Sequence, residues 1–146
     1  MTKEELFTQK AAKGYLVCYV ATCPLREQCL RYAVGKYYPP TQPVVKCINP
    51  LYAGVGTDDC HFYRQGEKVQ MACGITRIFT DDMPRSVEGY VRSSLRERFR
   101  RTVFFEYRNG TRLIPPDMQE YIRRLFREAG WDGEVEFDSY VEDYNW

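Results

Sequence analysis

The spacing of apolar residues changes near Pro84, and this change limits the folds that the chain can adopt. From Val87 to Phe99 an apolar residue recurs every fourth position, which places these side chains on one face of a helix. From Val69 to Ile75 the apolar residues alternate with others, as in a half-buried strand. A chain with both patterns predicts an α+β fold, with a small antiparallel sheet and with helices mainly in the C-terminal half.

Glycine and proline mark where the elements should begin and end. We expect helices over residues 4–13, 26–34, 84–101 and 116–130, and strands near 15–20, 61–64 and 68–79, the last two as a hairpin that turns at Gln65-Gly66. Residues 103–114 remain open, because Asn109-Gly110 suits either a hairpin turn or the left-handed cap of a short helix. The tail begins as a candidate strand at 135–137, and it is apolar enough to dock.

The length of 146 residues predicts a single domain, 1–146. Within it we distinguish a cysteine-containing sheet and loop half (about 1–80), an arginine-rich helical half (about 84–130) and a docked acidic tail (131–146). No apolar run approaches the ~18 residues that cross a bilayer, and the N-terminus lacks a charged and then apolar leader pattern. These features predict a cytoplasmic protein without membrane contact.

Charge is distributed unevenly along the chain, although the net charge is only +1. Residues 85–127 hold eleven arginines, no lysine and five acids, whereas residues 128–146 hold seven acids and no base. The two blocks could neutralise each other within the fold, or the arginines could bind a polyanion, for which the planar guanidinium is suited. The candidate nucleic-acid-binding residues are Arg92, Arg96, Arg100, Arg123, Arg124 and Arg127.

The six cysteines fall into two groups by their sequence context. Cys18 and Cys73 stand in apolar strand-like runs, where cysteine usually packs as a small hydrophobic residue. The other four occupy loops or helix edges and are candidate ligands of zinc or an iron–sulfur cluster, with His61 as a substitute ligand: Cys23, Cys29, Cys47 and Cys60. Their spacing contains no CxxC pair, so reduced cysteines that bind no metal remain an alternative. A redox or nucleophilic thiol at Cys23 or Cys60 is a further alternative.

The sequence offers little for catalysis. His61 is the only histidine, and an adjacent Cys60 on the same strand would point to the opposite face. Gly54-Val-Gly56 lacks the third glycine of a dinucleotide loop, and no phosphate-binding loop of the Walker type occurs. We therefore assign no catalytic residue and do not favour an enzyme.

Several short motifs resemble one family along nearly the whole chain, from about Tyr15 to Trp146. They are Cys23-Pro-Leu-Arg-Glu-Gln-Cys29, Cys47-Ile-Asn-Pro50, Cys60-His-Phe-Tyr-Arg64, Leu113-Ile-Pro-Pro-Asp-Met-Gln119 and Phe137-Asp-Ser-Tyr140. The resemblance is to an uncharacterised domain-of-unknown-function family of small cysteine-containing proteins from gut bacteria, and it implies no particular reaction, cofactor or substrate.

Taken together, the residues favour a non-enzymatic cytoplasmic binding or interaction protein, with a protein as candidate partner and a candidate structural metal held by cysteines. One alternative is a nucleic-acid-binding regulator that uses the arginine-rich helices. The other is a thiol or iron–sulfur redox protein.

Overall fold

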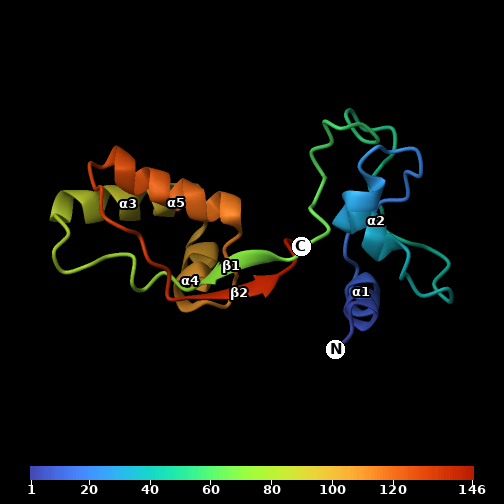
Figure 1. The fold of residues 1–146 in the computed structure, drawn as a ribbon, viewed down its shortest axis with the longest axis horizontal. Helices are drawn as coiled ribbons and strands as arrows, with labels where there is room; N and C mark the ends of the chain where they lie inside the picture. Colours follow the sequence, from blue (N-terminus) through green and yellow to red (C-terminus); the bar gives the residue numbers. More distant parts are fainter. The chain divides into compact units, whose positions relative to one another are not determined.

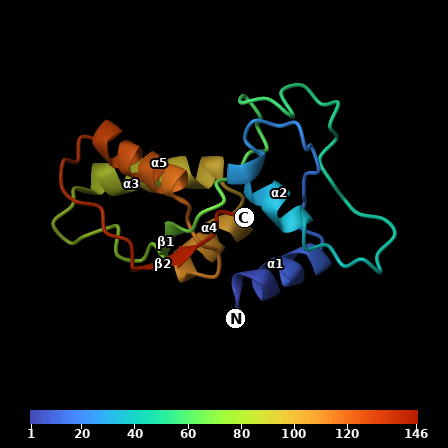
Figure 2. The ribbon, with the colours of Figure 1, turned by 45° about the vertical axis from the view of Figure 1, so that its right-hand side comes forward.

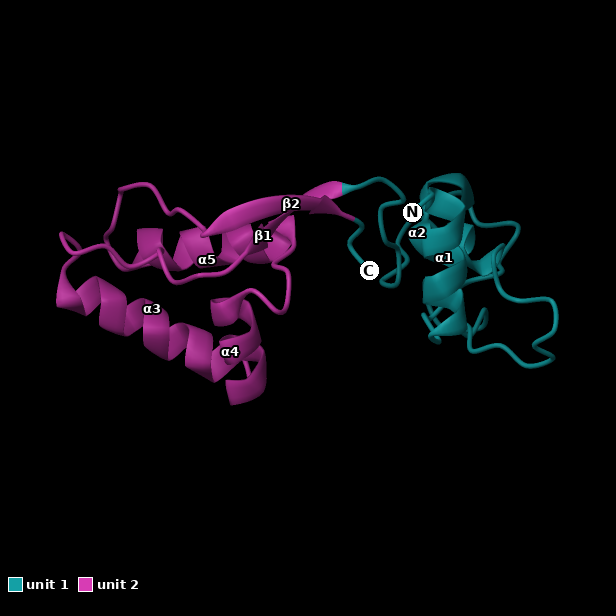
Figure 3. Ribbon diagram, turned by 90° about the horizontal axis from the view of Figure 1, so that it is seen from below, with its two compact units in different colours: residues 1–68, 144–146 teal, residues 69–143 magenta.

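The computed structural model describes residues 1–146 and divides them into two compact units (Figures 1 and 3). Unit 1 comprises Met1–Lys68 and Tyr144–Trp146, and unit 2 comprises Val69–Asp143. The chain therefore passes between the units twice. The expectation that residues 1–146 form a single domain stays a prediction, and each unit is described by itself below.

Unit 1 contains three short helices: α1 (Lys3–Ala12), the 3₁₀ helix η1 (Arg26–Gln28) and α2 (Leu30–Gly35). A capping box starts α1, because the Thr2 hydroxyl accepts from the Glu5 amide at 3.1 Å and the Glu5 carboxylate accepts from the Thr2 amide at 2.8 Å. The helix buries Phe7 and Ala11. The remainder of unit 1 is made of turns and loops, so helix packing alone does not account for its core.

The core of unit 1 is built around Phe7 and closed by the last residues of the chain. Val17, Leu30 and Val34 are fully buried beside it. The ring of Phe7 meets that of Tyr144 edge-on, with centroids 5.2 Å apart. Each buried aromatic ring removes a large apolar area from water, and edge-to-face contacts such as this one add to the stabilisation.

Unit 2 contains the sheet, which has two antiparallel strands, β1 (Val69–Cys73) and β2 (Ser139–Asp143). Val69 pairs with Asp143 and Cys73 pairs with Ser139. In addition to the pairing of β1 with β2, Ala72 of β1 forms an isolated bridge with Ile114, with N–O distances of 2.8 and 2.9 Å in the two directions. This bridge ties the segment before the last helix to the sheet.

Three helices complete unit 2: α3 (Arg85–Arg98), α4 (Arg101–Asn109) and α5 (Pro116–Glu128). Figures 1 and 2 both show α3 and α5 lying side by side. Their apolar faces form the core with residues of β1 and of the tail; its fully buried members are Ala72, Ile78, Val91, Leu95, Ile114, Ile122 and Phe126. Gly110 ends α4 at φ 81°, in the left-handed region that favours glycine.

Asp138 fixes the loop that follows β1. Its carboxylate accepts from the Thr76 hydroxyl at 2.7 Å, from the Thr76 amide at 3.2 Å and from the Arg77 amide at 2.9 Å. Burial would by itself raise the pKa of Asp138, but these hydrogen bonds outweigh burial and lower the pKa below its ordinary value. Gly74, at φ 87°, passes so close to Asp138 that a Cβ would collide with the carboxylate.

The α+β class and the C-terminal position of most helices are confirmed, but the expected sheet was wrong in its strands, in its turn and in the position of its tail strand. Residues 15–20 and 61–64 contribute no strand, and β1 pairs with residues 139–143 instead of 61–64. Gln65 and Gly66 do not form a hairpin turn, because Gly66 donates to the Gln28 carbonyl at 2.8 Å and Gln65 bridges to Cys29. The helical alternative for 103–114 is the observed one, and the tail strand lies at 139–143 and not at 135–137.

None of these helices combines the length and the apolar character needed to span a membrane.

Candidate functional site

A groove of about 400 Å³ in unit 2 collects arginine and phenylalanine side chains from α3 and α4. Arg92 and Arg96 come from α3, Phe99 from the junction that follows it, and the remaining lining residues from α4: Arg101, Phe104, Phe105 and Arg108. Only two residues separate the helices, so the C-terminal half of α3 and the whole of α4 contribute to the same surface.

The charge of this groove is poorly compensated. Among its four arginines, only Arg92 has a carboxylate partner, Glu88, one helical turn earlier at 2.9 Å. Arg96 and Arg108 are exposed and form no ion pair. Arg101 lies over the ring of Phe105, 5.6 Å from its centroid. Unpaired guanidinium groups in a groove attract anions, and phosphate matches their bidentate geometry.

The aromatic side chains add a flat apolar surface between these charges. Phe105 is 41% exposed, whereas the neighbouring Phe104 is only 6% exposed and belongs to the core. Their rings meet edge-on with centroids 5.9 Å apart, so the buried ring supports the exposed one. An exposed ring flanked by arginines is a surface on which an unpaired nucleobase can stack.

The structure places the six arginines named from the sequence at different sites of unit 2. Arg92 and Arg96 line the groove, and Arg100 precedes α4 at an exposed position outside the lining. The other three lie on α5: Arg123, Arg124 and Arg127. Sequence reasoning missed Arg101, Phe105 and Arg108, because the segment that holds them remained open between hairpin and helix. Their i, i+4 and i+7 spacing would have identified them once that segment was taken as a helix.

The arginines of α5 have partners within unit 2. Arg127 pairs with Glu120 at 2.6 Å, and its hydrogen bond lowers the pKa of that carboxyl. Arg124 pairs with Glu128 at 3.6 Å, and Arg123 lies over the ring of Phe137, 5.3 Å from its centroid. These contacts compensate the basic side chains of α5 far better than those of the groove.

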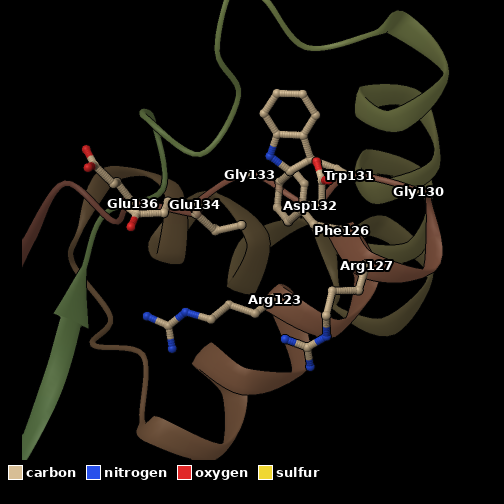
Figure 4. A pocket seen from close by; sticks show the side chains of 10 residues that line it. Arg123, Phe126, Arg127, Gly130, Trp131, Asp132, Gly133, Glu134 and Glu136 are labelled. Carbon is tan, nitrogen blue, oxygen red and sulfur yellow. The ribbon is translucent and has the colours of Figure 1, made fainter.

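A second hollow, of about 650 Å³, lies between α5 and the segment that follows it (Figure 4). Arg123 and Arg127 contribute positive charge, while Asp132, Glu134 and Glu136 contribute negative charge. The mixture of signs makes this hollow a weaker candidate for an anion than the groove on α3 and α4.

Unit 1 holds a different site, a small cavity of about 20 Å³ lined by four cysteines: Cys18, Cys23, Cys29 and Cys60. The rest of the lining is largely apolar and aromatic, and Val20, Leu25 and Ile48 belong to it. None of the six cysteines forms a disulfide. A volume of this size accommodates about one water-sized group.

Main-chain hydrogen bonds bring the four cysteine segments together. The Cys18 amide donates to the Arg31 carbonyl at 3.2 Å, and the Cys23 amide closes a turn on Val20 at 3.2 Å. Cys29 precedes α2, whose first residue, Leu30, donates to the Arg64 carbonyl at 2.7 Å. This last bond holds the segment that carries Cys60 against the start of α2.

Arg31 also lines this cavity and ties its walls to one another. Its side chain is buried, and it donates to the Phe62 carbonyl at 2.7 Å and to the Leu16 carbonyl at 2.8 Å. It also lies over the Tyr15 ring, 5.2 Å from the centroid. No carboxylate pairs with Arg31. The guanidinium therefore acts as a cross-link between three backbone segments.

Burial raises the pKa of the Cys18 thiol, and the nearby thiols of Cys29, Cys23 and Cys60 raise it further. Three of the cysteines proposed from the sequence as metal ligands thus line one cavity. Cys47 and His61 are exposed and do not line it. Cys18 was missed because its apolar neighbours suggested simple packing. As placed, no three His, Cys, Asp or Glu side chains stand close enough to share a metal ion.

Comparison with known proteins agrees with the motif resemblance. Residues 1–146 match the model of a "Family of unknown function (DUF6078)". No curated protein and no solved structure matches the chain. Because the family model covers the full described length, the chain belongs to the family of unknown function DUF6078.

Proposed function

We propose that this chain is a non-enzymatic, cytoplasmic binding protein that holds single-stranded nucleic acid in the groove on α3 and α4. The observation that carries the proposal is a set of four arginines around an exposed phenylalanine, of which only Arg92 has a carboxylate partner. Arginine binds phosphate through paired N–H donors, and an aromatic ring stacks on bases of any sequence. The groove combines both functions within two consecutive helices.

Single strands suit this surface better than a duplex. Bases in a duplex already stack on one another and cannot stack on Phe105, whereas those of a single strand can. An acidic protein segment would use the arginines but would leave the exposed ring of Phe105 without a matching group. The aromatic contribution therefore separates the proposed ligand from other polyanions.

The charge of the groove sets the expected salt dependence. Of the four arginines, one is compensated by Glu88, so about three phosphates can be neutralised. For single strands the logarithm of the binding constant then falls against the logarithm of salt concentration with a slope of about −2. Fluorescence anisotropy with labelled oligo-dT and oligo-rU over a salt series measures this slope directly.

Variants separate the contribution of phosphate contacts from that of base stacking. Arg96→Gln and Arg108→Gln should each reduce the slope by about 0.7, because each removes one phosphate contact. Phe105→Ala should weaken binding by roughly 5-fold to 100-fold and leave the slope unchanged, because it removes one stacking contact. Arg124→Gln is the matched control, since Arg124 is exposed but lies on α5 and pairs with Glu128.

Three results would overturn the proposal. The first is an absence of binding at low salt, and the second is an equal loss of binding in Arg124→Gln and Arg96→Gln. The third is binding that Phe105→Ala leaves unchanged and that polyglutamate displaces as efficiently as oligonucleotide, which would identify an acidic protein as the ligand class.

A further inference from the structure

The four cysteines of unit 1 converge on one cavity from three separate stretches of chain. Cys18 precedes a turn that holds Cys23, Cys29 stands at the start of α2, and Cys60 comes from a distant loop. A free cysteine packs as a small hydrophobic side chain, but here four thiols line the same small space. A soft metal ion, in contrast, requires such a set of thiolates.

We infer that Cys18, Cys23, Cys29 and Cys60 bind a single Zn²⁺ ion. Four cysteine thiolates form the closed tetrahedral set of a structural zinc site. With the thiols as placed, the cavity of about 20 Å³ has room for about one water-sized group. The inference concerns unit 1 alone and is independent of the nucleic-acid groove, which lies in unit 2.

Binding requires the thiols to turn toward one another. No three side chains of ligand type are close enough to share an ion in the structure, although the four cysteines line the same cavity. A cysteine has one side-chain torsion before its sulfur, so a change between staggered rotamers moves each thiol without moving the backbone. The thiols must also lose their protons, and the positive ion offsets the mutual repulsion of the thiolates.

The surroundings of the cavity suit a structural ion better than a reactive one. Ile48, Phe62 and Tyr63 line it together with other apolar residues, and Arg31 holds its walls in place. Unit 1 has short helices, and its strand-like contacts are isolated bridges such as Val17 to Cys47. A metal cross-link would stabilise this loop-rich unit in the way that small folds commonly use metals.

Elemental analysis of the untagged full chain, purified under reducing conditions, tests the inference first. We expect about one zinc ion per chain. Cys18→Ser, Cys23→Ser, Cys29→Ser and Cys60→Ser should each lose the metal. Cys47→Ser and Cys73→Ser are the controls that should retain it, because Cys47 is exposed and Cys73 lies on β1 of unit 2. His61→Ala should also retain it.

A second measurement uses the unaltered protein and so does not depend on whether the variants fold. Iodoacetamide should modify the four cavity cysteines only after a chelator has removed the ion, while the modification of Cys47 should not change. Co²⁺ added to the chelated protein should give the visible absorption of a tetrahedral thiolate complex. The inference is wrong if the wild-type chain neither contains nor takes up zinc, if it contains an iron cluster, or if Cys47→Ser loses the ion and Cys18→Ser keeps it.

Discussion

Replacement of Arg31 by methionine should destabilise unit 1 by about 2–4 kcal/mol. Arg31 is only 8% exposed, and its guanidinium makes two short hydrogen bonds to the carbonyls of Leu16 and Phe62. Hydrogen bonds to charged groups contribute about 1.5–3 kcal/mol each, so the two together give about 3–6 kcal/mol. Methionine fills much of the same volume and removes a buried charge without an acidic partner, which offsets part of the loss.

The assay can follow unit 1 separately, because the two tryptophans lie in different units. Trp146 packs in unit 1, and Trp131 packs against the core of unit 2. In a Trp131→Phe background, urea denaturation followed by fluorescence therefore reports the environment of Trp146. Lys46→Met is the matched control, since Lys46 is exposed and makes no ion pair, and it should change the free energy of unfolding by less than about 0.5 kcal/mol.

Arg31→Lys distinguishes a loss of charge from a loss of geometry. A single ammonium group does not reproduce the guanidinium fork that reaches both carbonyls, so we expect about half of the methionine effect. A loss below about 1 kcal/mol for Arg31→Met, or wild-type stability for Arg31→Lys, would refute the view that Arg31 cross-links these segments.

Four other substitutions test features of both units. Asp138→Asn should cost unit 2 about 1–2 kcal/mol at neutral pH. Because the folded pKa of Asp138 is lowered, its contribution to stability is fully present above the ordinary value of 3.8 and is lost as pH falls through the folded value. The urea midpoints of the wild-type chain and of Asp138→Asn, measured from pH 7 downward, should therefore converge in acid. Exposed Asp132→Asn is the control. Gly74→Ala should destabilise unit 2 by at least about 2 kcal/mol, because Gly74 has a positive φ and a Cβ there would collide with Asp138. Gly89→Ala, in the middle of α3 with open space around it, should instead stabilise unit 2 by about 0.5–1 kcal/mol. Thermal melts in which both variants shifted stability in the same direction would contradict this account. Trp146→Ala should lower the stability of unit 1 by about 2 kcal/mol, measured by near-ultraviolet circular dichroism, and an unchanged midpoint would mean that the last residues do not support that core.

The positions of most helices were predictable because their signals are local. Two boundaries were wrong, because the helix expected over 84–101 ends at Arg98 and the one expected over 26–34 is divided at Cys29. The four-residue apolar spacing from Val87 to Leu95 corresponds to the buried face of α3, and Pro116 begins α5. The sheet was not predictable in the same way. β1 pairs with a strand about 70 residues further along the chain, and a turn signal such as Gln65-Gly66 can indicate only a neighbouring partner.

The candidate sites likewise combine features that local sequence reveals with features that only the folded chain reveals. Loop context identified Cys23, Cys29 and Cys60 as a group, but only the folded chain places Cys18 beside them and Cys47 elsewhere. For the arginines, the sequence shows how many positive charges there are but not which side chains have acidic partners. The pairs Arg124–Glu128 and Arg127–Glu120 arise from helical spacing and side-chain direction, and they shift attention from α5 to the groove on α3 and α4.

The position of Tyr144–Trp146 in unit 1 affects how the chain folds during synthesis. Proteins commonly fold from the N-terminus as they leave the ribosome, with each domain complete before the next emerges. Here the core of unit 1 is complete only after residue 146 has been synthesised, because Tyr144 and Trp146 close the aromatic cluster around Phe7. All of unit 2 is therefore translated before unit 1 can finish its core, and the N-terminal segment remains open to chaperones and proteases for the whole interval.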